Sequence, residues 1–539
     1  MLASSELDEA SASVTYSPLT QSRSSAVASR AVIVACWWWR LSRCHRHMTE
    51  ALRFQLSRWV FLRLVSLTYL LAFGSLASQI AGLIGTDGLL PVDVFLQRGQ
   101  EFYGGRAYYL LPTLLWISAS DIALQILCWG GMGLAVLAMV GVTPVVTFSL
   151  LWLFYLSLAV GGQTFLSFQW DTLLLETGLL ACLYAPIGWL PGLATERRAS
   201  TLIRWLLWVL AFKVTFLSGV TKLVSGDETW RALTALTFHY QTQPIPAWTS
   251  WFAHQLPLSI QQASAVGMLG IEIVVPFFVF VPARLRWMRR LACVVLCLLQ
   301  IAIAVTGNYG FFNLLTCALY LTLLDDGHIG SLLPNRLVDM ARTRGAFLVE
   351  PIPWRVTLAC ATLLIGTMSG LTLWREATYT RPHADWSNRL VSLVRPTRSI
   401  NGYGLFRTMT TERPEIIIEG THDGQQWTEY AFRWKPGDLN RRPVFVQPHM
   451  PRLDWLMWFA ALDPLSHQHW LGPLAEHLLT GSPTIVALLA DDPFPDTPPR
   501  LVRMAVYDYR FTTLDESLET GHWWEREFRS YLTEPMSLP

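Results

Sequence analysis

The chain has 539 residues, of which 52% are hydrophobic and only 15% are charged, and its formal net charge is +2. Soluble domains usually carry about a quarter charged residues, so this composition excludes an ordinary soluble globular protein and favours a polytopic membrane protein. The sequence contains no basic block that would indicate a nucleic-acid partner, and we expect none.

Residues 1–57 precede the first long apolar segment. They are rich in Ser, Ala and Arg and show no helical or strand periodicity, so we expect a disordered N-terminal tail. The apolar stretch at 31–39 is short and is followed by no small-residue cleavage site, which argues against a signal peptide. Met48 is an alternative start of the protein.

Long apolar segments occupy most of residues 58–375. A membrane-spanning helix needs about 20 apolar residues, and about nine segments approach or exceed this length. We therefore predict a polytopic α-helical transmembrane bundle. Its expected spans are 59–84, 121–142, 144–160, 166–188, 202–224, 264–282, 287–306, 309–324 and 355–374.

Arginines near the ends of these segments predict their orientation, because cytoplasmic loops are enriched in basic residues. With a cytoplasmic N-terminus, arginine clusters fall on the inner side, in the tail and in the loops after the fourth, sixth and eighth spans. The outer loops hold only Arg98, Arg106 and Arg231. This bias puts the loop 225–263 and the region 376–539 on the external or luminal side.

The chain has only three lysines, Lys213, Lys222 and Lys435, although Lys and Arg together number 41. Two of the three fall in the apolar segment 202–224. An ammonium group inside a bilayer is costly and is usually paired or lines a functional cavity. These two lysines are therefore candidate site residues.

Depth along the helices predicts charge pairs within the bilayer. Asp171 and Glu176 lie roughly 8 and 15 Å below the outer end of their span, at 1.5 Å per residue. Lys222 and Lys213 lie at matching depths in the next span, so we expect the pairs Asp171–Lys222 and Glu176–Lys213, with Glu272 of the sixth span nearby. Such a network either fixes how the helices dock or has a function of its own, and the sequence leaves both open.

Residues 376–539 form the predicted external domain. PEIIIEGT, EYAFRW, RPVFVQP and RMAVYDYRF have the composition of strands, and RLDWLMWFAAL and WLGPLAEHLL are typical of helices with an apolar face. We expect a β-rich α+β domain on the outer membrane face, without disulfides because no cysteine follows Cys360. In the preceding external loop, Trp230, Trp248 and Trp251 are predicted to anchor at the membrane interface.

Motifs of well-known catalytic sites are absent from the sequence. It contains no GxSxG, no GxxxxGK[ST], no HExxH and no CxxC. We therefore expect no catalytic residue, no metal site and no cofactor.

Several stretches together resemble the lipase maturation factor family. AGLIGTDGLLPV (81–92) fits the family pattern, and the resemblance covers nearly everything from Arg58 to Asp515 and supports Met48 as the start. The other stretches are SFQWDTLLLETG (167–178), KLVSGDETW (222–230), NGYGLFRTMTTERPEIIIEGTHDG (401–424), FRWKPGDLNRRP (432–443) and PRLDWLMWFAAL (451–462).

The resemblance implies a multi-pass membrane protein without enzymatic activity. Eukaryotic members lie in the endoplasmic reticulum membrane, where they assist the folding and assembly of secreted lipases, and their luminal C-terminal region is held to bind these clients. The residues that match the pattern of that region become candidate client-binding residues: Asn401, Tyr403, Gly404, Phe406, Glu412, Arg413, Glu419, Gly420, Lys435, Pro436, Gly437, Arg442, Arg452, Asp454 and Trp455.

The arginine-rich, lysine-poor composition is typical of a GC-rich bacterial genome, so we expect a bacterial member of the family. Such a protein would lie in the cytoplasmic membrane, in contact with membrane lipid. Its clients would be exported proteins such as lipases or other hydrolases. A eukaryotic member would instead lie in the endoplasmic reticulum membrane.

The alternative hypothesis is an integral membrane enzyme. A bundle with an internal lysine followed by an external β-rich domain is similar in outline to vitamin K-dependent carboxylases. Lys213 or Lys222 would then be a base, with Glu176 or Glu272 as its partner. An enzyme needs open volume beside the lysine, whereas a scaffold is expected to enclose the lysine in an ion pair. Transport is a weaker third hypothesis, because no inverted repeat supports it.

Overall fold

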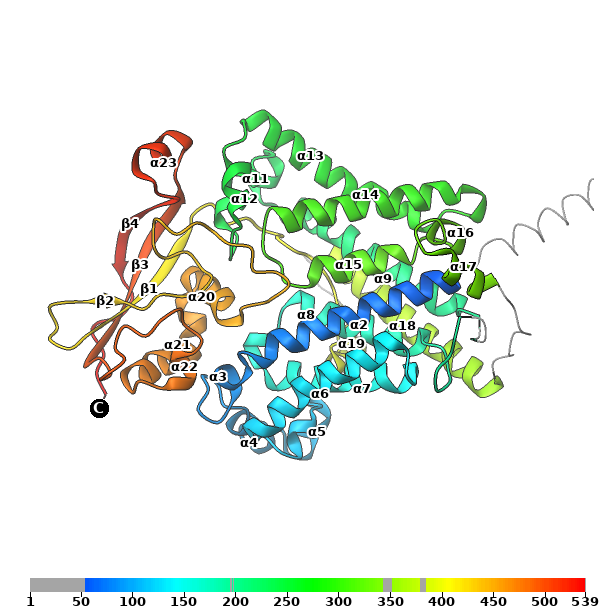
Figure 1. Ribbon diagram of the computed structural model, residues 1–539, viewed down its shortest axis with the longest axis horizontal. Helices are drawn as coiled ribbons and strands as arrows, with labels where there is room; N and C mark the ends of the chain where they lie inside the picture. The colour runs from blue at the N-terminus through cyan, green and yellow to red at the C-terminus, as the bar shows by residue number, and fades with distance from the viewer. Residues whose placement is uncertain (1–53, 194–195, 197, 343–350, 379–383, 539) are drawn as a thin grey trace, which may run out of the picture. The chain divides into compact units, whose positions relative to one another are not determined.

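The long apolar segments of the chain fold into a helical bundle (Figure 1). The computed structural model describes residues 54–538 except 194–195, 197, 343–350 and 379–383, so the predicted disordered tail lies almost entirely outside the described residues. Within them, seven helices are long and apolar enough to cross a membrane. They are α2 (Gln55–Ala77), α6 (Asp121–Val140), α7 (Pro144–Gly161), α9 (Thr201–Val224), α13 (Leu258–Val274) continued by η4 (Val275–Phe280), α14 (Arg286–Val305) and α18 (Ile352–Ala377).

The two remaining predicted spans form shorter helices. α8 (Gln169–Tyr184) has 16 residues and α15 (Phe312–Leu321) has 10, whereas a bilayer crossing takes roughly 20. Both pack against other helices of the bundle, and most of α8 is buried. Every predicted span therefore contains a helix, but not every one of these helices has spanning length.

Short helices lie in the connections between the spans. One of these connections fixes the start of α2. The Asp326 carboxylate in this connection accepts hydrogen bonds of 2.9–3.3 Å from the backbone N–H groups of Gln55, Leu56 and Ser57. These N–H groups have no partner within the helix, and the helix dipole favours an anion there. The connecting helices are α3 (Ile80–Ile84), α4 (Val92–Tyr103), η1 (Gly104–Arg106), α5 (Ala107–Leu110), η2 (Leu114–Trp116), η3 (Gln163–Leu166), η5 (Ala283–Leu285), α16 (Asp326–Ile329), α17 (Asn335–Arg342), α19 (Asp385–Val394) and η6 (Arg395–Thr397).

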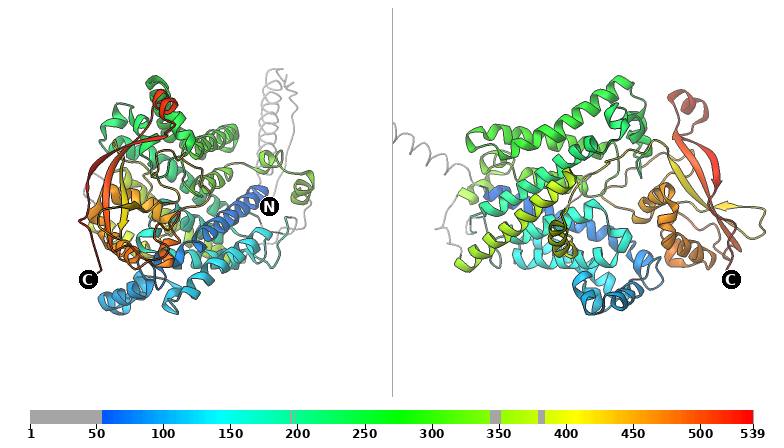
Figure 2. Two further views of the ribbon diagram at one scale, coloured as in Figure 1. Left: turned by 60° about the vertical axis from the view of Figure 1, so that its left-hand side comes forward. Right: turned by 180° about the vertical axis from the view of Figure 1, so that it is seen from behind.

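The C-terminal region contains a four-stranded antiparallel sheet in the order β2-β1-β3-β4. β1 is buried along its whole length and pairs with β3 from Pro414 opposite Asp508 to Thr421 opposite Leu501. Helices α20 and α21 lie against the sheet (Figure 2). The elements are β1 (Pro414–Thr421), β2 (Thr428–Glu429), α20 (Arg452–Leu462), α21 (Pro464–Leu479), α22 (Pro483–Val486), β3 (Leu501–Phe511), α23 (Leu514–Thr520) and β4 (Trp524–Tyr531).

The predicted strands of this region are confirmed only in part. PEIIIEGT and RMAVYDYRF form β1 and β3, whereas EYAFRW enters the sheet only at Glu429. The prediction of a strand at RPVFVQP is wrong, because its backbone bonds to the bundle instead. The Asn308 amide donates to the Val444 carbonyl, and its oxygen accepts from the Val446 N–H, both at 2.8 Å. A tertiary partner thus replaces the neighbouring strand.

The loop 225–263, which is predicted to be external, is folded against the C-terminal region. The prediction that its tryptophans anchor at the membrane interface is wrong for Trp230 and Trp251, which are buried. Their indole N–H groups donate to the Phe406 carbonyl at 3.1 Å and to the Thr512 hydroxyl at 3.2 Å. The helices of this loop are α10 (Glu228–Arg231), α11 (Ala235–Thr242) and α12 (Trp248–His254).

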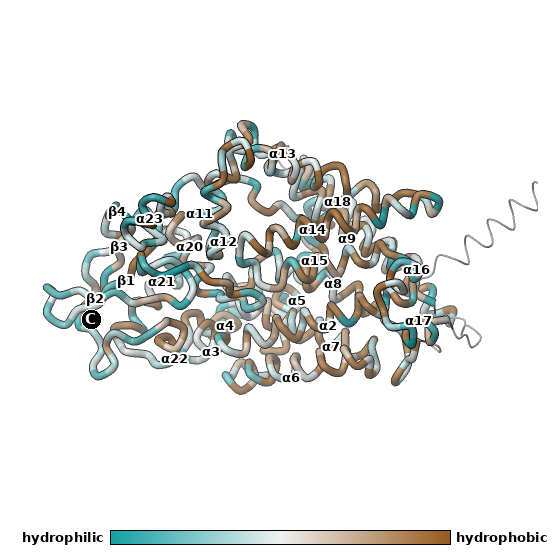
Figure 3. Tube along the Cα trace, turned by 45° about the horizontal axis from the view of Figure 1, so that its top comes forward, coloured by the Kyte–Doolittle hydropathy of each residue, from teal (hydrophilic) through white to brown (hydrophobic). Residues whose placement is uncertain are grey.

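The helical bundle and the C-terminal region differ in hydropathy. Hydrophobic residues dominate the bundle helices, whereas hydrophilic residues are frequent in the sheet and its helices (Figure 3). Large apolar side chains on α6, α13 and α14 are exposed, among them Ile126, Val266 and Leu298. Apolar side chains are expected on the outer face of a helix that lies in a bilayer, which fits the candidate spans.

Candidate functional site

A buried ion pair joins α8 to α9. The Lys213 amine lies 2.5 Å from Glu176 Oε1, and both side chains are buried. The two helices pack against each other, so equal depth along them brings the charges together. The predicted Glu176–Lys213 pair is confirmed.

The second carboxylate oxygen of Glu176 holds the segment that leads into the sheet. It accepts hydrogen bonds from the Tyr403 hydroxyl at 2.8 Å and from the Asn401 backbone N–H at 3.1 Å. The Lys213 amine also lies 5.5 Å from the centroid of the Tyr403 ring, within the range of cation–π attraction. The NGYG motif at 401–404 therefore completes the surroundings of a charge pair in the bundle.

The predicted pair between Asp171 and Lys222 is wrong. The partner of Asp171 is Arg452 of α20, which donates two hydrogen bonds of 2.6 and 2.8 Å to its carboxylate, and the Tyr155 hydroxyl donates a third at 2.6 Å. A planar guanidinium matches a carboxylate with two parallel N–H···O bonds from different nitrogens, a geometry that an ammonium with its single nitrogen does not have. Lys222 instead pairs with Glu272 of α13, whose two oxygens lie 2.7 and 2.9 Å away.

The start of α20 is fixed to the end of α2 by further bonds. The Arg452 backbone N–H donates to Gln79 Oε1 at 2.8 Å, and the Met450 N–H donates to the Ser75 hydroxyl at 2.9 Å. The His449 ring nitrogen lies 3.0 Å from the same hydroxyl. Sequence reasoning missed Ser75, Gln79 and Tyr155. For Arg452 there was a signal, a charged residue opening an otherwise apolar helix.

Another buried charge cluster lies at the base of the sheet. Glu415 of β1 pairs with Arg413 at 2.7 Å and with Lys435 at 2.9 Å, and all three side chains are buried. Arg413 also donates to the backbone carbonyls of Gln241 and Pro244 in the loop 225–263, at 2.6 and 2.9 Å. The third lysine of the chain therefore helps to join the sheet to that loop.

Two of the resembling stretches are bonded to each other through Asp454. Its carboxylate accepts hydrogen bonds from the backbone N–H groups of Trp434 and Lys435, at 2.8 and 2.9 Å. Burial raises the pKa of Asp454, although these bonds oppose the shift. The segments 432–443 and 451–462 are thus one structural unit.

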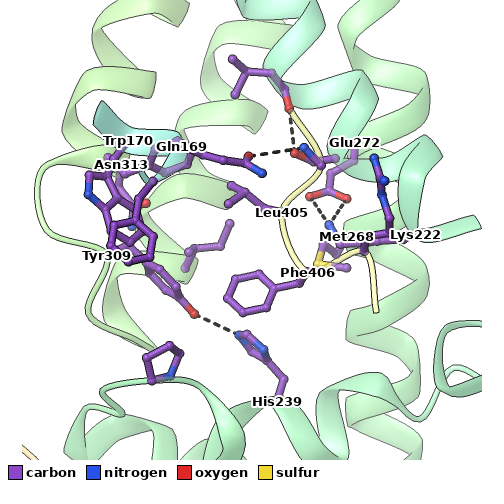
Figure 4. Close-up of a pocket in the computed structure, with 18 of the residues that line it drawn as sticks. Gln169, Trp170, Lys222, His239, Met268, Glu272, Tyr309, Asn313, Leu405 and Phe406 are labelled. Carbon is purple, nitrogen blue, oxygen red and sulfur yellow. Dashed lines mark hydrogen bonds and ion pairs between the residues drawn. The ribbon is translucent and has the colours of Figure 1, made fainter. Parts of the chain in front are cut away.

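A cavity of about 480 Å³ lies beside the Lys222–Glu272 pair, and we call it the Lys222 pocket. Its walls come from α8, α9, α11, α13, α14, α15 and α20 and from the segment 404–410. In Figure 4, Asn313 and Tyr309 lie on one side of the pocket and Lys222 and Glu272 on the other. The volume falls within the roughly 300–1,000 Å³ of small-molecule sites.

An enzyme needs open volume beside its lysine, whereas a scaffold encloses the lysine in an ion pair, and Lys213 and Lys222 differ in this respect. Lys213 is enclosed by Glu176 and Tyr403, as a scaffold requires. Lys222 does line a cavity, but it is bonded to both oxygens of Glu272. Both lysines are thus engaged by a carboxylate, so the geometry does not favour the hypothesis of an intramembrane base.

Most of the candidate client-binding residues are buried. Tyr403, Arg413, Lys435, Arg452 and Asp454 are all less than 4% exposed, and each has a partner within the fold. Glu412 and Arg442 are the exposed charged members of the set. Most residues of this set therefore lie at the junction between the sheet and the bundle or inside the domain rather than on an open surface.

These contacts define a multi-pass membrane protein whose C-terminal domain is fixed to its helical bundle by buried ion pairs. Comparison with known families gives the same two parts, a transmembrane domain and a C-terminal domain. Residues 56–331 match the lipase maturation factor transmembrane domain, and residues 399–533 match the lipase maturation factor C-terminal domain. The chain belongs to the lipase maturation factor family.

Vertebrate relatives align over most of the chain. Lipase maturation factor 2 of Mus musculus is 34% identical over 581 residues, which cover 87% of this chain and 81% of the relative. Lipase maturation factor 2 of Homo sapiens is 34% identical over 88% of this chain and 82% of its own length. Lipase maturation factor 1 of Bos taurus is 34% identical over 90% of this chain and 89% of its own. No solved structure matches the chain. These relatives give no support to the expectation of a bacterial member.

Replacing Lys213 with Met should destabilise the bundle, because Glu176 would be left buried without its cation. Breaking a buried ion pair by removing one partner typically costs about 3–5 kcal/mol. We expect a lower level of folded protein in the membrane and earlier thermal unfolding in detergent. The double variant Lys213→Met/Glu176→Gln should recover most of the loss, since the amide oxygen can still accept from Tyr403. Equal stability of Lys213→Met and the unaltered protein would contradict the assignment.

Replacing Arg452 with Met should weaken the junction between the sheet and the bundle by a similar amount, about 3–5 kcal/mol. Limited proteolysis should then release a C-terminal fragment sooner. Arg510→Met is the matched control, because Arg510 is half-exposed and pairs with Glu516 at 2.7 Å, and surface pairs contribute about 1 kcal/mol or less. The interpretation fails if both variants resist the protease equally.

Acidification should destabilise the junction through His449. Burial, aided by the positive charges of Arg452 and Arg433, lowers the pKa of His449 from 6.5 to about 4. Between these values the unfolded chain binds more protons than the folded one, so this contribution to stability is present above pH 6.5 and is lost as the pH falls towards 4. His449→Gln, which can still bond to Ser75, should flatten the fall in thermal stability over this pH range. A pH profile identical to that of the unaltered protein would exclude the role.

Proposed function

We propose that the protein assists the folding and assembly of lipases as a membrane-bound maturation factor. The observation that carries the proposal is the match to both domains of the lipase maturation factor family, over 56–331 and 399–533. The buried pairs of Arg452 and Tyr403 give the proposal a physical basis, because they hold the C-terminal domain in a fixed position on the bundle. A client bound to the domain would thus be held at the membrane surface.

The proposal includes an arrangement of the chain in the membrane. Residues 1–57 form a tail with a cytoplasmic N-terminus, 58–375 form the bundle, and 376–539 face the lumen or the exterior. The excess of arginine on the other side of the spans supports this orientation. In a eukaryotic cell the protein would lie in the endoplasmic reticulum membrane, and in a bacterium it would lie in the cytoplasmic membrane.

We place client contacts on exposed parts of the C-terminal domain. Glu412 and Arg442 are the charged family-pattern residues that a client could reach. Glu412 lies 3.2 Å from Arg529 at the surface, and the Arg442 guanidinium lies 5.9 Å from the ring of Trp248. The buried members of the set support these contacts indirectly, by holding the domain in place.

The test measures lipase activity in cells whose own lipase maturation factor has been removed. Producing this protein together with a secreted lipase should raise the enzymatic activity per mass of secreted lipase. Arg452→Met should lose this effect in proportion to the loss of intact junction, whereas Arg510→Met should keep it. Normal levels of the protein in the membrane with no gain in lipase activity would overturn the proposal.

A further inference from the structure

The Lys222 pocket contains buried polar atoms that have no hydrogen-bond partner among the described residues. Both amide atoms of Asn313 are in this condition, and so are Oε1 of Gln300 and the indole N–H groups of Trp455 and Trp458. Each of these side chains is at most 8% exposed, and all four line the pocket. Buried polar groups in native proteins are nearly always bonded. Their concentration around one cavity therefore indicates a ligand.

The unpartnered atoms specify the chemistry of that ligand. The Asn313 amide nitrogen and the two indole N–H groups are donors and require an acceptor oxygen. The Asn313 and Gln300 oxygens are acceptors and require a hydroxyl or amine donor. A ligand that satisfies both sets carries at least one hydroxyl group, which donates, and more than one oxygen that accepts, because a hydroxyl oxygen has two lone pairs and the wall offers at least three donor groups.

The rest of the wall excludes a charged or fully polar ligand. The charged side chains that line the pocket are Lys222, Glu272 and Arg407. Lys222 is paired with Glu272, and Arg407 lies 2.6 Å from Glu376, so the wall carries no net charge. Most other lining residues are apolar. Water would fill such a space poorly, because each buried water needs two to four polar partners.

The pocket lies against two candidate spans whose other faces are apolar. Met268 on α13 and Leu299 and Ile303 on α14 line the cavity. Other faces of these two helices expose apolar side chains such as Val266 and Leu298. The pocket thus lies next to helices that suit a hydrocarbon environment.

One wall of the pocket belongs to the C-terminal domain. Phe406, in the segment that follows the NGYG motif, lies between the two sides of the cavity in Figure 4. Its carbonyl accepts from Trp230, and its ring lies 4.6 Å from that of His239. Trp455 and Trp458 of α20 complete this wall. A bound molecule would therefore contact the bundle and the domain together.

We propose that the Lys222 pocket binds one uncharged acylglycerol, with its acyl chain among the apolar side chains and its hydroxyl and ester groups bonded to Asn313, Gln300 and the indoles. This ligand supplies the donor and the acceptor that the wall requires, and it carries no charge. A phospholipid would bring a charged head group to a neutral wall, a sterol would supply a single oxygen for at least three donor groups, and an alkane would leave every polar atom unpartnered.

The test uses a monoacylglycerol with a photoreactive group in its acyl chain and an alkyne tag, added to the purified full-length protein in detergent. After illumination, labelled peptides should map to α14 and α15. Excess unlabelled monoacylglycerol should suppress the labelling, whereas phospholipid, cholesterol and hexadecane at the same concentration should not. Labelling that is not suppressed by monoacylglycerol, or is suppressed better by another of these competitors, would overturn the proposal.

Two variants from different walls test the assignment of the pocket. Asn313→Leu removes both amide atoms, and Ile303→Trp fills the cavity. Each should reduce specific labelling by roughly tenfold, the scale of losing one or two hydrogen bonds or the space for the chain. Asn388→Leu, at an exposed position of α19, should leave the labelling unchanged. The proposal falls if the folded form of either pocket variant, checked by its thermal unfolding midpoint, labels like the unaltered protein.

Discussion

The carboxylate of Asp171 is buried in a helical bundle, and its positive partner comes from outside that bundle. A charge in such a place is tolerated only when it is paired and hydrogen-bonded, and Arg452 and Tyr155 meet both requirements. Glu176, on the same helix, repeats the arrangement with Lys213 and Tyr403. The packing of α8 thus depends on residues of the C-terminal domain, and the position of the domain depends on α8.

The segments that match the family are contiguous in space for the same reason. The NGYG motif contacts Glu176, the segment 432–443 is bonded to Asp454, and Arg413 joins the sheet to the loop 225–263. A stable junction requires all of these polar groups at once, because a buried donor or acceptor that loses its partner destabilises the fold. Several residues of the resembling stretches in the C-terminal domain thus lie where the domain is attached to the bundle.

Length and hydropathy were sufficient to predict the helices of the bundle, since a span needs only an apolar run of the right length. Depth along neighbouring helices was also sufficient for Glu176 and Lys213. It failed for Asp171, because the argument considered only charges within the spans, and Arg452 lies 281 residues further along the chain. The segment at 442–448 resembles a strand in composition but bonds to Asn308, and the buried Trp230 and Trp251 resemble interface anchors. Both errors arise from long-range contacts that local composition does not encode.

The separation between Asp171 and Arg452 has a consequence for biosynthesis. During synthesis α8 is made before Arg452, so the Asp171 carboxylate lacks this cation until residue 452 has been translated and the C-terminal domain has folded against the bundle. A chain that stops before residue 452 leaves Asp171 without the guanidinium that balances its charge in the complete fold. The buried pair therefore forms only after the C-terminal domain has been made.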